Sequence, residues 1–190
     1  MAPQSRPGGV FMPDATALSA LIGSGLPATY TFLYQRLAHL LDRRGTPEPE
    51  PDLPPTLEGE VQLPLVADAQ QLARHQLELM HLRDALHPYQ RGAVPIDTTD
   101  EPLLRTLGRL RGFLEEVYGQ RLTFTGEQRP ASGPYVRQQT DVVRGELTGM
   151  EAEDITGTAE VFQDTNTVEA GGKVIGMQAD RIGRARRKHP

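Results

Sequence analysis

Gly-Glu-Leu-Thr-Gly-Met-Glu-Ala-Glu-Asp-Ile, residues 145–155, returns with changes as Gly-Lys-Val-Ile-Gly-Met-Gln-Ala-Asp-Arg-Ile, residues 172–182. The offset in residue number between the two stretches is 172 − 145 = 27. Both glycines, the methionine, the alanine and the last isoleucine are identical, and Leu147 is matched by Val174. A fixed period with glycine and apolar residues in register is typical of stacked units, none of which buries its apolar face alone. The repeat therefore decides the architecture predicted for the last quarter of the chain.

Around this repeat, over residues 140–183, apolar residues stand singly between Gly, Thr and charged residues, which predicts short strands separated by turns. The period fits one coil of a small parallel β-solenoid or a pair of related hairpins. A duplicated linker without a packed core is the third interpretation. Seven glycines are expected to turn the chain with positive φ: Gly145, Gly149, Gly157, Gly171, Gly172, Gly176 and Gly183.

Two units are few for an isolated repeat. We therefore expect the segment to be capped by the rest of the chain, to stack on another chain, or to be flexible. Short β rungs leave unpaired edges, and such edges recruit further strands. The residues predicted to matter for assembly are Gly149, Met150, Gly176 and Met177.

Upstream of the repeat, apolar residues follow a helical period. Four helices are expected: one after a cap at Asp14, one from near Pro27 to Gly45, one over about 66–86 that Pro88 stops, and one from Asp100-Glu-Pro102 to Gly119. Leu122-Thr-Phe124 is expected to be a short strand. The predicted fold class is α+β, with a small N-terminal bundle of about four helices followed by a short Gly/Val-repeat β segment, β-solenoid-like or made of hairpins.

Composition shifts divide the chain into five predicted segments. They are a disordered N-terminus (1–13), a helical domain (14–120) with an acidic Pro-rich linker (45–60), a connector (121–139), the Gly/Val-repeat β segment (140–183) and a basic tail (184–190). The linker is expected to be extended because proline blocks the helical ladder.

The overall composition excludes several classes of function. The chain of 190 residues has no cysteine, which rules out disulfides, thiolate nucleophiles and Cys-ligated zinc. The formal net charge of −5 disfavours nucleic acid as the main partner of the surface. The most apolar stretch, 15–41, is interrupted by Gly, Pro and polar residues, so no transmembrane span is predicted. No secretory signal precedes it, and a cytoplasmic protein is expected.

No motif for catalysis, cofactor binding or metal binding emerges from the residues. His75, His81 and His87 recur every six residues, which turns about 240° per step on a helix and scatters them around the axis. Gly171-Gly172-Lys173 lacks the spacing of a phosphate loop. Glu115 and Glu116 are adjacent and face different sides of a helix, so they do not form an acid–base pair. We therefore predict no enzyme and no cofactor.

The C-terminal end is basic. The last ten residues contain no acid and carry Arg181, Arg184, Arg186, Arg187 and Lys188. The plainest interpretation is a solvated tail. The alternative is a regulatory adaptor that docks an acidic protein partner, nucleic acid or an anionic surface through this tail.

Three further stretches carry a resemblance. They are Gly119-Gln-Arg-Leu-Thr-Phe-Thr-Gly-Glu127, Gly133-Pro-Tyr-Val136 and Val168-Glu-Ala-Gly-Gly172-Lys-Val-Ile-Gly176. In pattern, residues 60–183 resemble uncharacterised small proteins of GC-rich bacteria that join a helical front to a Gly/Val-repeat tail. Some similar proteins accompany NTPase-centred defence or signalling systems. The resemblance implies an accessory role in such a system and brings no site residues with it.

These observations together predict a non-enzymatic interaction or scaffold protein that self-associates as a homo-oligomer through its C-terminal repeat. The basic-tail adaptor is the competing hypothesis. An enzyme with an unfamiliar site is a third class, which an enclosed polar pocket with titratable residues would indicate.

Overall fold

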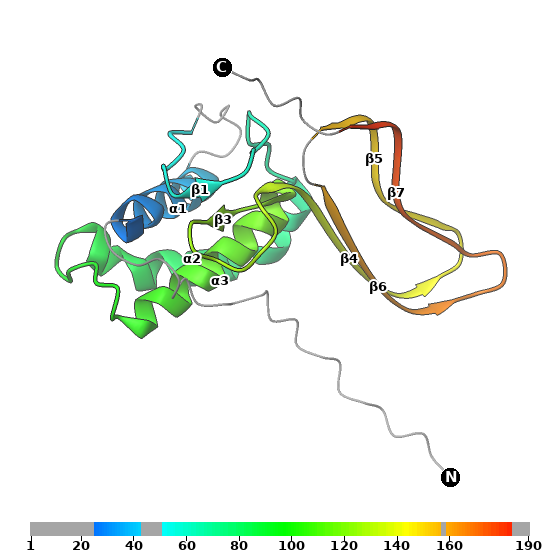
Figure 1. The fold of residues 1–190 in the computed structure, drawn as a ribbon. Coiled ribbons are helices and arrows are strands. Elements are labelled where there is room, and N and C mark those ends of the chain that lie inside the picture. Colours follow the sequence, from blue (N-terminus) through cyan, green and yellow to red (C-terminus); the bar gives the residue numbers. More distant parts are fainter. Residues whose placement is uncertain (1–24, 43–50, 157–158, 184–190) are drawn as a thin grey trace, which may run out of the picture.

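The structure, a computed structural model, describes residues 25–42, 51–156 and 159–183. These residues form three helices: α1 (Gly25–Asp42), α2 (Ala69–Gln90) and α3 (Glu101–Tyr118). They also form seven strands: β1 (Leu57–Glu58), β2 (Gln120–Arg121), β3 (Thr123–Phe124), β4 (Gly133–Val143), β5 (Glu146–Thr156), β6 (Glu160–Val168) and β7 (Lys173–Gly183). Figure 1 shows the helices gathered in one body, from which the four long strands extend as a curled ribbon.

The helical body is built around a core of leucines and aromatic rings. Each helix packs against the other two. The fully buried leucines are Leu26, Leu33, Leu37, Leu79, Leu86, Leu103, Leu107, Leu110, Leu114 and Leu122. Because burying one leucine side chain contributes about 1.5–3 kcal/mol, this core is a stable base for the strands that project from it.

Side-chain caps define where the helices begin. The Asp68 carboxylate accepts hydrogen bonds from the backbone N–H groups of Gln70 at 2.7 Å and Gln71 at 2.9 Å, which starts α2. Asp100 accepts from the N–H of Leu103 at 3.0 Å, and Gly119 ends α3 in the left-handed region with a φ of 61°. The predicted cap at Asp100 and the predicted end at Gly119 are confirmed.

α2 does not end where the sequence predicted. Pro88 lies inside its last turn, and the helix continues to Gln90. A proline removes one helical hydrogen bond and crowds the preceding turn. Only one short turn follows here, and its end is held because the N–H of Arg91 donates to the His87 carbonyl at 3.1 Å.

Short strands attach the segments next to the helices. β1 pairs antiparallel with β3, and Leu57 lies opposite Phe124. Leu53 and Leu57 pack against the helical core, so this part of the predicted acidic linker lies on the body. Residues 43–50 of that linker lie outside the described residues. β2 pairs antiparallel with the start of β4 and joins the body to the ribbon.

The four long strands form two parallel pairs. β4 runs parallel to β6, with Val143 opposite Val168, which gives an offset in residue number of 168 − 143 = 25. β5 runs parallel to β7, with Met150 opposite Met177, which gives an offset of 177 − 150 = 27. The offset of the sequence repeat is thus the pairing register between β5 and β7.

The two offsets differ because the two turns differ in length. Residues 144–145 connect β4 to β5, whereas residues 169–172 connect β6 to β7. The longer turn accounts for the larger second offset. It includes Gly171, whose φ of 89° lies in the region that glycine adopts without strain.

The structure is α+β, but the predicted four-helix bundle with a β-solenoid-like or hairpin segment is wrong. The described residues contain three helices, and the predicted helix after Asp14 lies outside them. β2, β4 and β6 form a mixed sheet, because β2 is antiparallel and β6 parallel to β4. With the β5–β7 pair they make a curled half-barrel that continues from the body (Figure 1).

Candidate assembly surface

The long strands form two repeat units that lie one on the other. We call residues 133–156, with β4 and β5, the first repeat unit, and residues 160–183, with β6 and β7, the second. In the described part of the chain, β6 pairs only with β4, and β7 only with β5. The free side of the second unit, the outer edge, therefore presents backbone N–H and C=O groups without a strand partner there.

The opposite side of the first unit, which we call the inner edge, is also largely open. β4 has β2 as a second neighbour only at Gly133 and Pro134. β5 pairs with no strand but β7 among the residues that the structure covers. Each chain thus carries one open strand edge on each unit.

In each unit one glutamine connects the two strands, and it does so in the same way in both units. Gln138 in β4 donates from Nε2 to the carbonyl of Thr148 in β5 at 3.0 Å. Gln163 in β6 donates from Nε2 to the carbonyl of Ile175 in β7 at 3.1 Å. The same Nε2 group also donates to Oε1 of Gln138 at 3.0 Å, which links the two units as an amide ladder. Such ladders favour further strands in the same register.

Charged and polar side chains also pair between the units. Arg144 Nε lies 3.2 Å from the Glu169 carboxylate, and Lys173 Nζ lies 3.6 Å from that of Glu146. Asn166 donates to the carboxylate of Asp141 at 3.0 Å. Each pair joins one side chain of the first unit to one of the second. Because these ion pairs are exposed, each contributes only about 0–1 kcal/mol to stability. Their main effect is to fix the register in which the strands of the two units pair.

Apolar side chains remain exposed on the ribbon. The large ones are Val142, Phe162, Val168 and Val174, with 41, 49, 49 and 39% of their surface exposed. Val143, opposite Val168, is only 4% exposed. Three of the four exposed side chains belong to the second unit, so the unit that ends the stack is the less covered one.

The four residues predicted for assembly lie within this ribbon. Gly149 and Met150 are in β5, Gly176 and Met177 are in β7, and the two methionines are opposite each other. Neither Gly149 nor Gly176 has a positive φ, so the prediction that they turn the chain is wrong. The reason is that both belong to strands rather than to the connections between them.

At one of the two positions glycine is required because neighbouring atoms lie too close for a side chain, and not because of its backbone conformation. A Cβ on Gly149 would overlap the side chain of Val161 and the carbonyl oxygen of Gly176. A Cβ on Gly176 would meet no atom of this chain nearer than Gln163 Oε1 at 3.8 Å. Glycine at position 149 therefore allows β5 to approach β6 and β7 closely.

Of the predicted basic docking residues, the structure describes one. Arg181 is exposed in β7, in register with Asp154 of β5. Arg184, Arg186, Arg187 and Lys188 lie outside the described residues. Docking through the tail stays a prediction.

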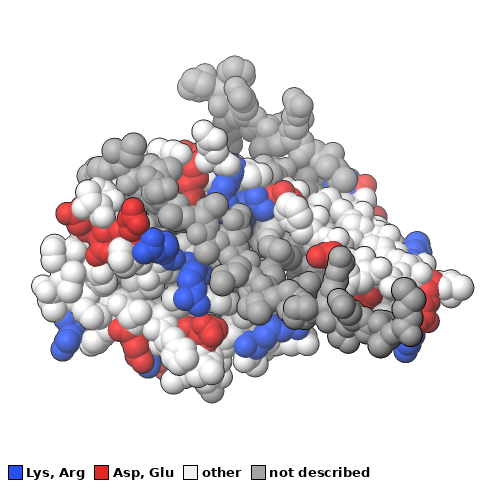
Figure 2. Space-filling model, turned by 90° about the horizontal axis from the view of Figure 1, so that it is seen from below, with Lys and Arg blue, Asp and Glu red and all other residues white. Residues whose placement is uncertain are grey.

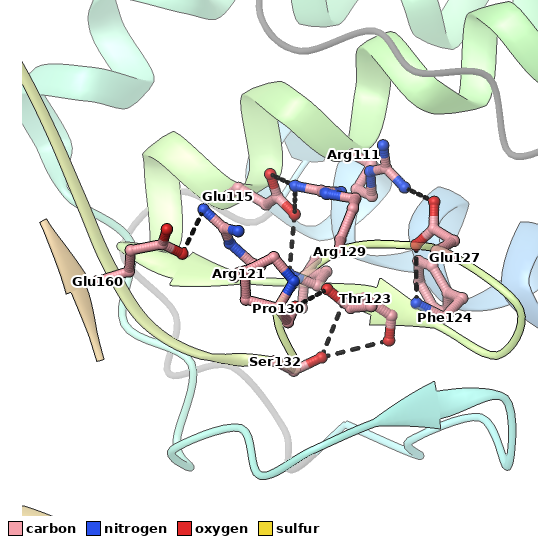
Figure 3. Close-up of polar contacts among 11 residues, drawn as sticks. Arg111, Glu115, Arg121, Thr123, Phe124, Glu127, Arg129, Pro130, Ser132 and Glu160 are labelled. Atoms are coloured by element: carbon pink, nitrogen blue, oxygen red, sulfur yellow. Dashed lines mark hydrogen bonds and ion pairs between the residues drawn. The ribbon is translucent and has the colours of Figure 1, made fainter. Parts of the chain in front are cut away.

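A group of buried ion pairs joins the helical body to the segment that leads into the ribbon (Figure 3). Arg111 of α3 pairs with Glu127, and burial lowers the pKa of this guanidinium from its usual value. Glu115, one turn later, accepts from Arg129 at 2.9 and 3.0 Å. Both carboxylates also accept backbone N–H groups: Glu127 from Phe124 at 2.8 Å and Glu115 from Leu122 at 2.9 Å. The pairs therefore fix the path of the connecting segment.

Arg121 extends this group to the second repeat unit. Its guanidinium lies 2.7 Å from the Glu160 carboxylate at the start of β6. It also lies over the ring of Tyr135, 4.8 Å from the centroid, and 6.0 Å from that of Phe162. We call these contacts the Arg121 dock, because they hold the ribbon against the body.

Neither the Arg121 dock nor the part of the repeat that relates β4 to β6 was predicted from the sequence. In the register that pairs β4 with β6, the two strands share identical residues at Val136/Val161, Gln138/Gln163, Thr140/Thr165 and Val143/Val168. A search that allowed a second offset would have found this. Arg111 and Glu115 carried a different signal, an oppositely charged i, i+4 pair within the apolar face of a helix.

Elsewhere on the described surface, large apolar side chains are exposed at Leu63, Val66, Leu77 and Met80. Figure 2 shows acidic and basic side chains side by side on the visible face. In residues 25–42, 51–156 and 159–183, no three His, Asp or Glu side chains gather as a metal site would require. His75 is buried and pairs with Glu116 at 2.7 Å. No described helix has the length and apolar character needed to cross a membrane.

Comparisons with protein-family models, curated proteins and solved structures gave no match for this chain.

Proposed function

We propose that this protein is a non-enzymatic scaffold that self-associates through the outer edge of its second repeat unit. The observation that carries the proposal is that β6 and β7 each pair with one strand among the described residues. Open edges recruit strands. Association would supply the missing neighbour.

The side chains beside the edge support the same proposal. Val168 and Val174 are half exposed on the second unit, whereas their partners Val143 and Leu147 are more buried on the first. Covering these side chains with another chain would remove apolar surface from water at roughly 25 cal/mol per Å². A role in a larger signalling or defence assembly would follow from such association, and rests on the sequence resemblance.

The first test is the solution mass of the full-length protein over a range of concentrations, by size exclusion with light scattering. We expect the mass to rise with concentration. The double variant Val168→Lys/Val174→Lys should remain monomeric, because growth would bury two ammonium groups against apolar side chains. The double variant Leu77→Lys/Met80→Lys is the matched control, since both side chains are exposed on α2, away from the ribbon. It should associate like the parent.

A monomeric parent at every concentration would overturn the proposal. Equal loss of association in both double variants would show that the edge is not the contact.

A further inference from the structure

We infer that the outer edge takes the inner edge of a second copy of this chain, head to tail and in the parallel register that already joins the two units within one chain. This inference rests on the proposed function and adds the partner surface, the direction and the register. The second unit of one copy would lie against the first unit of the next, as it does against its own.

The charged side chains at the turns 144–145 and 169–172 favour this arrangement. Within one chain, Arg144 and Glu146 of the first unit lie next to Glu169 and Lys173 of the second. Despite these pairs, the side chains of Glu169 and Lys173 remain 47 and 64% exposed. The inner edge of another copy would bring an arginine to Glu169 and a glutamate to Lys173. Both of these ion pairs would therefore recur between chains.

The amide ladder favours the same register. Gln163 donates to Oε1 of Gln138 one unit away, while each glutamine holds its own unit together through Thr148 or Ile175. A copy added in register places its own Gln138 next to Gln163, and the ladder continues without a break. A shift by one residue would move the glutamines to the other face of the strand.

The apolar side chains fit as well. Val168 is 49% exposed, and in register it would be covered by Val143 of the next copy, the pairing that exists within the chain. Val174 would likewise be covered by Leu147 of the next copy. A two-fold contact between two outer edges would reproduce none of these pairs, because it sets the second unit against itself.

The absence of cysteine from the chain allows a direct test. Val142 and Thr167 are exposed and lie opposite each other within the chain. Two full-length single-cysteine variants, Val142→Cys and Thr167→Cys, are mixed and oxidised mildly. In the inferred stack, residue 167 of one copy lies about 4.8 Å from residue 142 of the next, within the Cα range of a disulfide. We expect disulfide-linked dimers in the mixture and none in either variant alone.

A mixture of Thr167→Cys with Thr140→Cys is the register control. Thr140 is two residues from Val142 on the same strand face, and its partner within the chain is Thr165. The added distance of roughly 7 Å along the strand places the Cα atoms too far apart for a disulfide. This mixture should stay largely uncrosslinked.

The outcomes distinguish a failure of the inference from a failure of the proposed function. Light scattering is run on the same samples before oxidation. Monomers throughout would overturn the proposed function and the inference with it. Oligomers in which Thr167→Cys crosslinks alone would mean that outer edges meet each other. Oligomers that crosslink as well through residue 140, or not at all, would overturn the register and leave self-association standing.

Discussion

At Gly149 the ribbon leaves no room for a side chain, because the Val161 side chain and the Gly176 carbonyl occupy the space of a Cβ. A carbonyl cannot rotate aside as a side chain does, so Gly149→Ala must separate β5 from β7. We expect a cost of about 1–3 kcal/mol. In hydrogen exchange, amides of β5 and β7 should lose protection while those of the helices keep it. Unchanged protection in β5 would contradict the close approach.

Gly176 is the matched position, with a different expected result. Within the chain Gly176→Ala meets nothing nearer than 3.8 Å, so exchange in dilute monomer should equal that of the parent. In a head-to-tail stack, however, Gly176 would lie against Gly149 of the next copy as Gly149 lies against Gly176 now. The alanine variant should therefore associate less without being less stable. This pair of variants separates folding from assembly.

Tyr30 is expected to make the helical body less stable at alkaline pH. Its hydroxyl is buried and donates to the Leu86 carbonyl at 2.9 Å, and burial raises its pKa above the ordinary value. An unfolded chain ionises tyrosine near pH 10, whereas the folded chain keeps this proton. The stabilisation is complete below about pH 10 and falls as pH rises from there, by about 1.4 kcal/mol per pH unit.

The variant Tyr30→Phe tests that expectation. At pH 7 it should lose about 1 kcal/mol for the missing hydrogen bond. Above pH 10 its unfolding free energy should fall less steeply than that of the parent, by the contribution of one proton. Denaturant unfolding followed by helical circular dichroism at several pH values measures both effects. Equal slopes for variant and parent would show that another group causes the alkaline loss.

At the scale of elements, the helices were predictable where caps and apolar period agree. The sequence predicts that α3 begins after Asp100 and ends at Gly119, and the structure agrees. The end of α2 was not predictable from Pro88, since the local rule says only that proline disfavours a helix and tertiary packing decides the last turn. Proline and acidic residues likewise suggested an extended linker, but Leu53 and Leu57 within it reach the core.

Of the two pairs of long strands, the sequence repeat revealed only one, for a geometric reason. A repeat search at one offset finds strands separated by turns of equal length, and here the turn 169–172 is longer than the turn 144–145. The match between β4 and β6 has the shorter offset and therefore lay outside the period that relates β5 to β7. The role of Gly149 could not be predicted either, because close contact between the strands depends on how the ribbon curls.

For the whole molecule, the height of the helical body limits how copies stack. Neighbouring strands lie about 4.8 Å apart, so one copy with two units adds about 9.6 Å. A single helix with its side chains is about 10–12 Å across, and the body packs three of them. Bodies held identically by the Arg121 dock would collide in successive copies. Every head-to-tail contact, that of the first two copies included, therefore requires the body to swing away from the ribbon.

The Arg121 dock should accordingly restrain assembly. The variant Arg121→Gln removes the ion pair with Glu160 and the contacts with the rings of Tyr135 and Phe162, a loss of about 2 kcal/mol. If this contact must open before growth, the variant should form long oligomers at a concentration roughly tenfold or more below that of the parent. Arg105→Gln is the control, since Arg105 pairs with Glu101 on an exposed helix face. Light scattering over a dilution series measures the threshold. A higher threshold for Arg121→Gln, with helical circular dichroism unchanged, would mean that the dock supports the edge and does not restrain it.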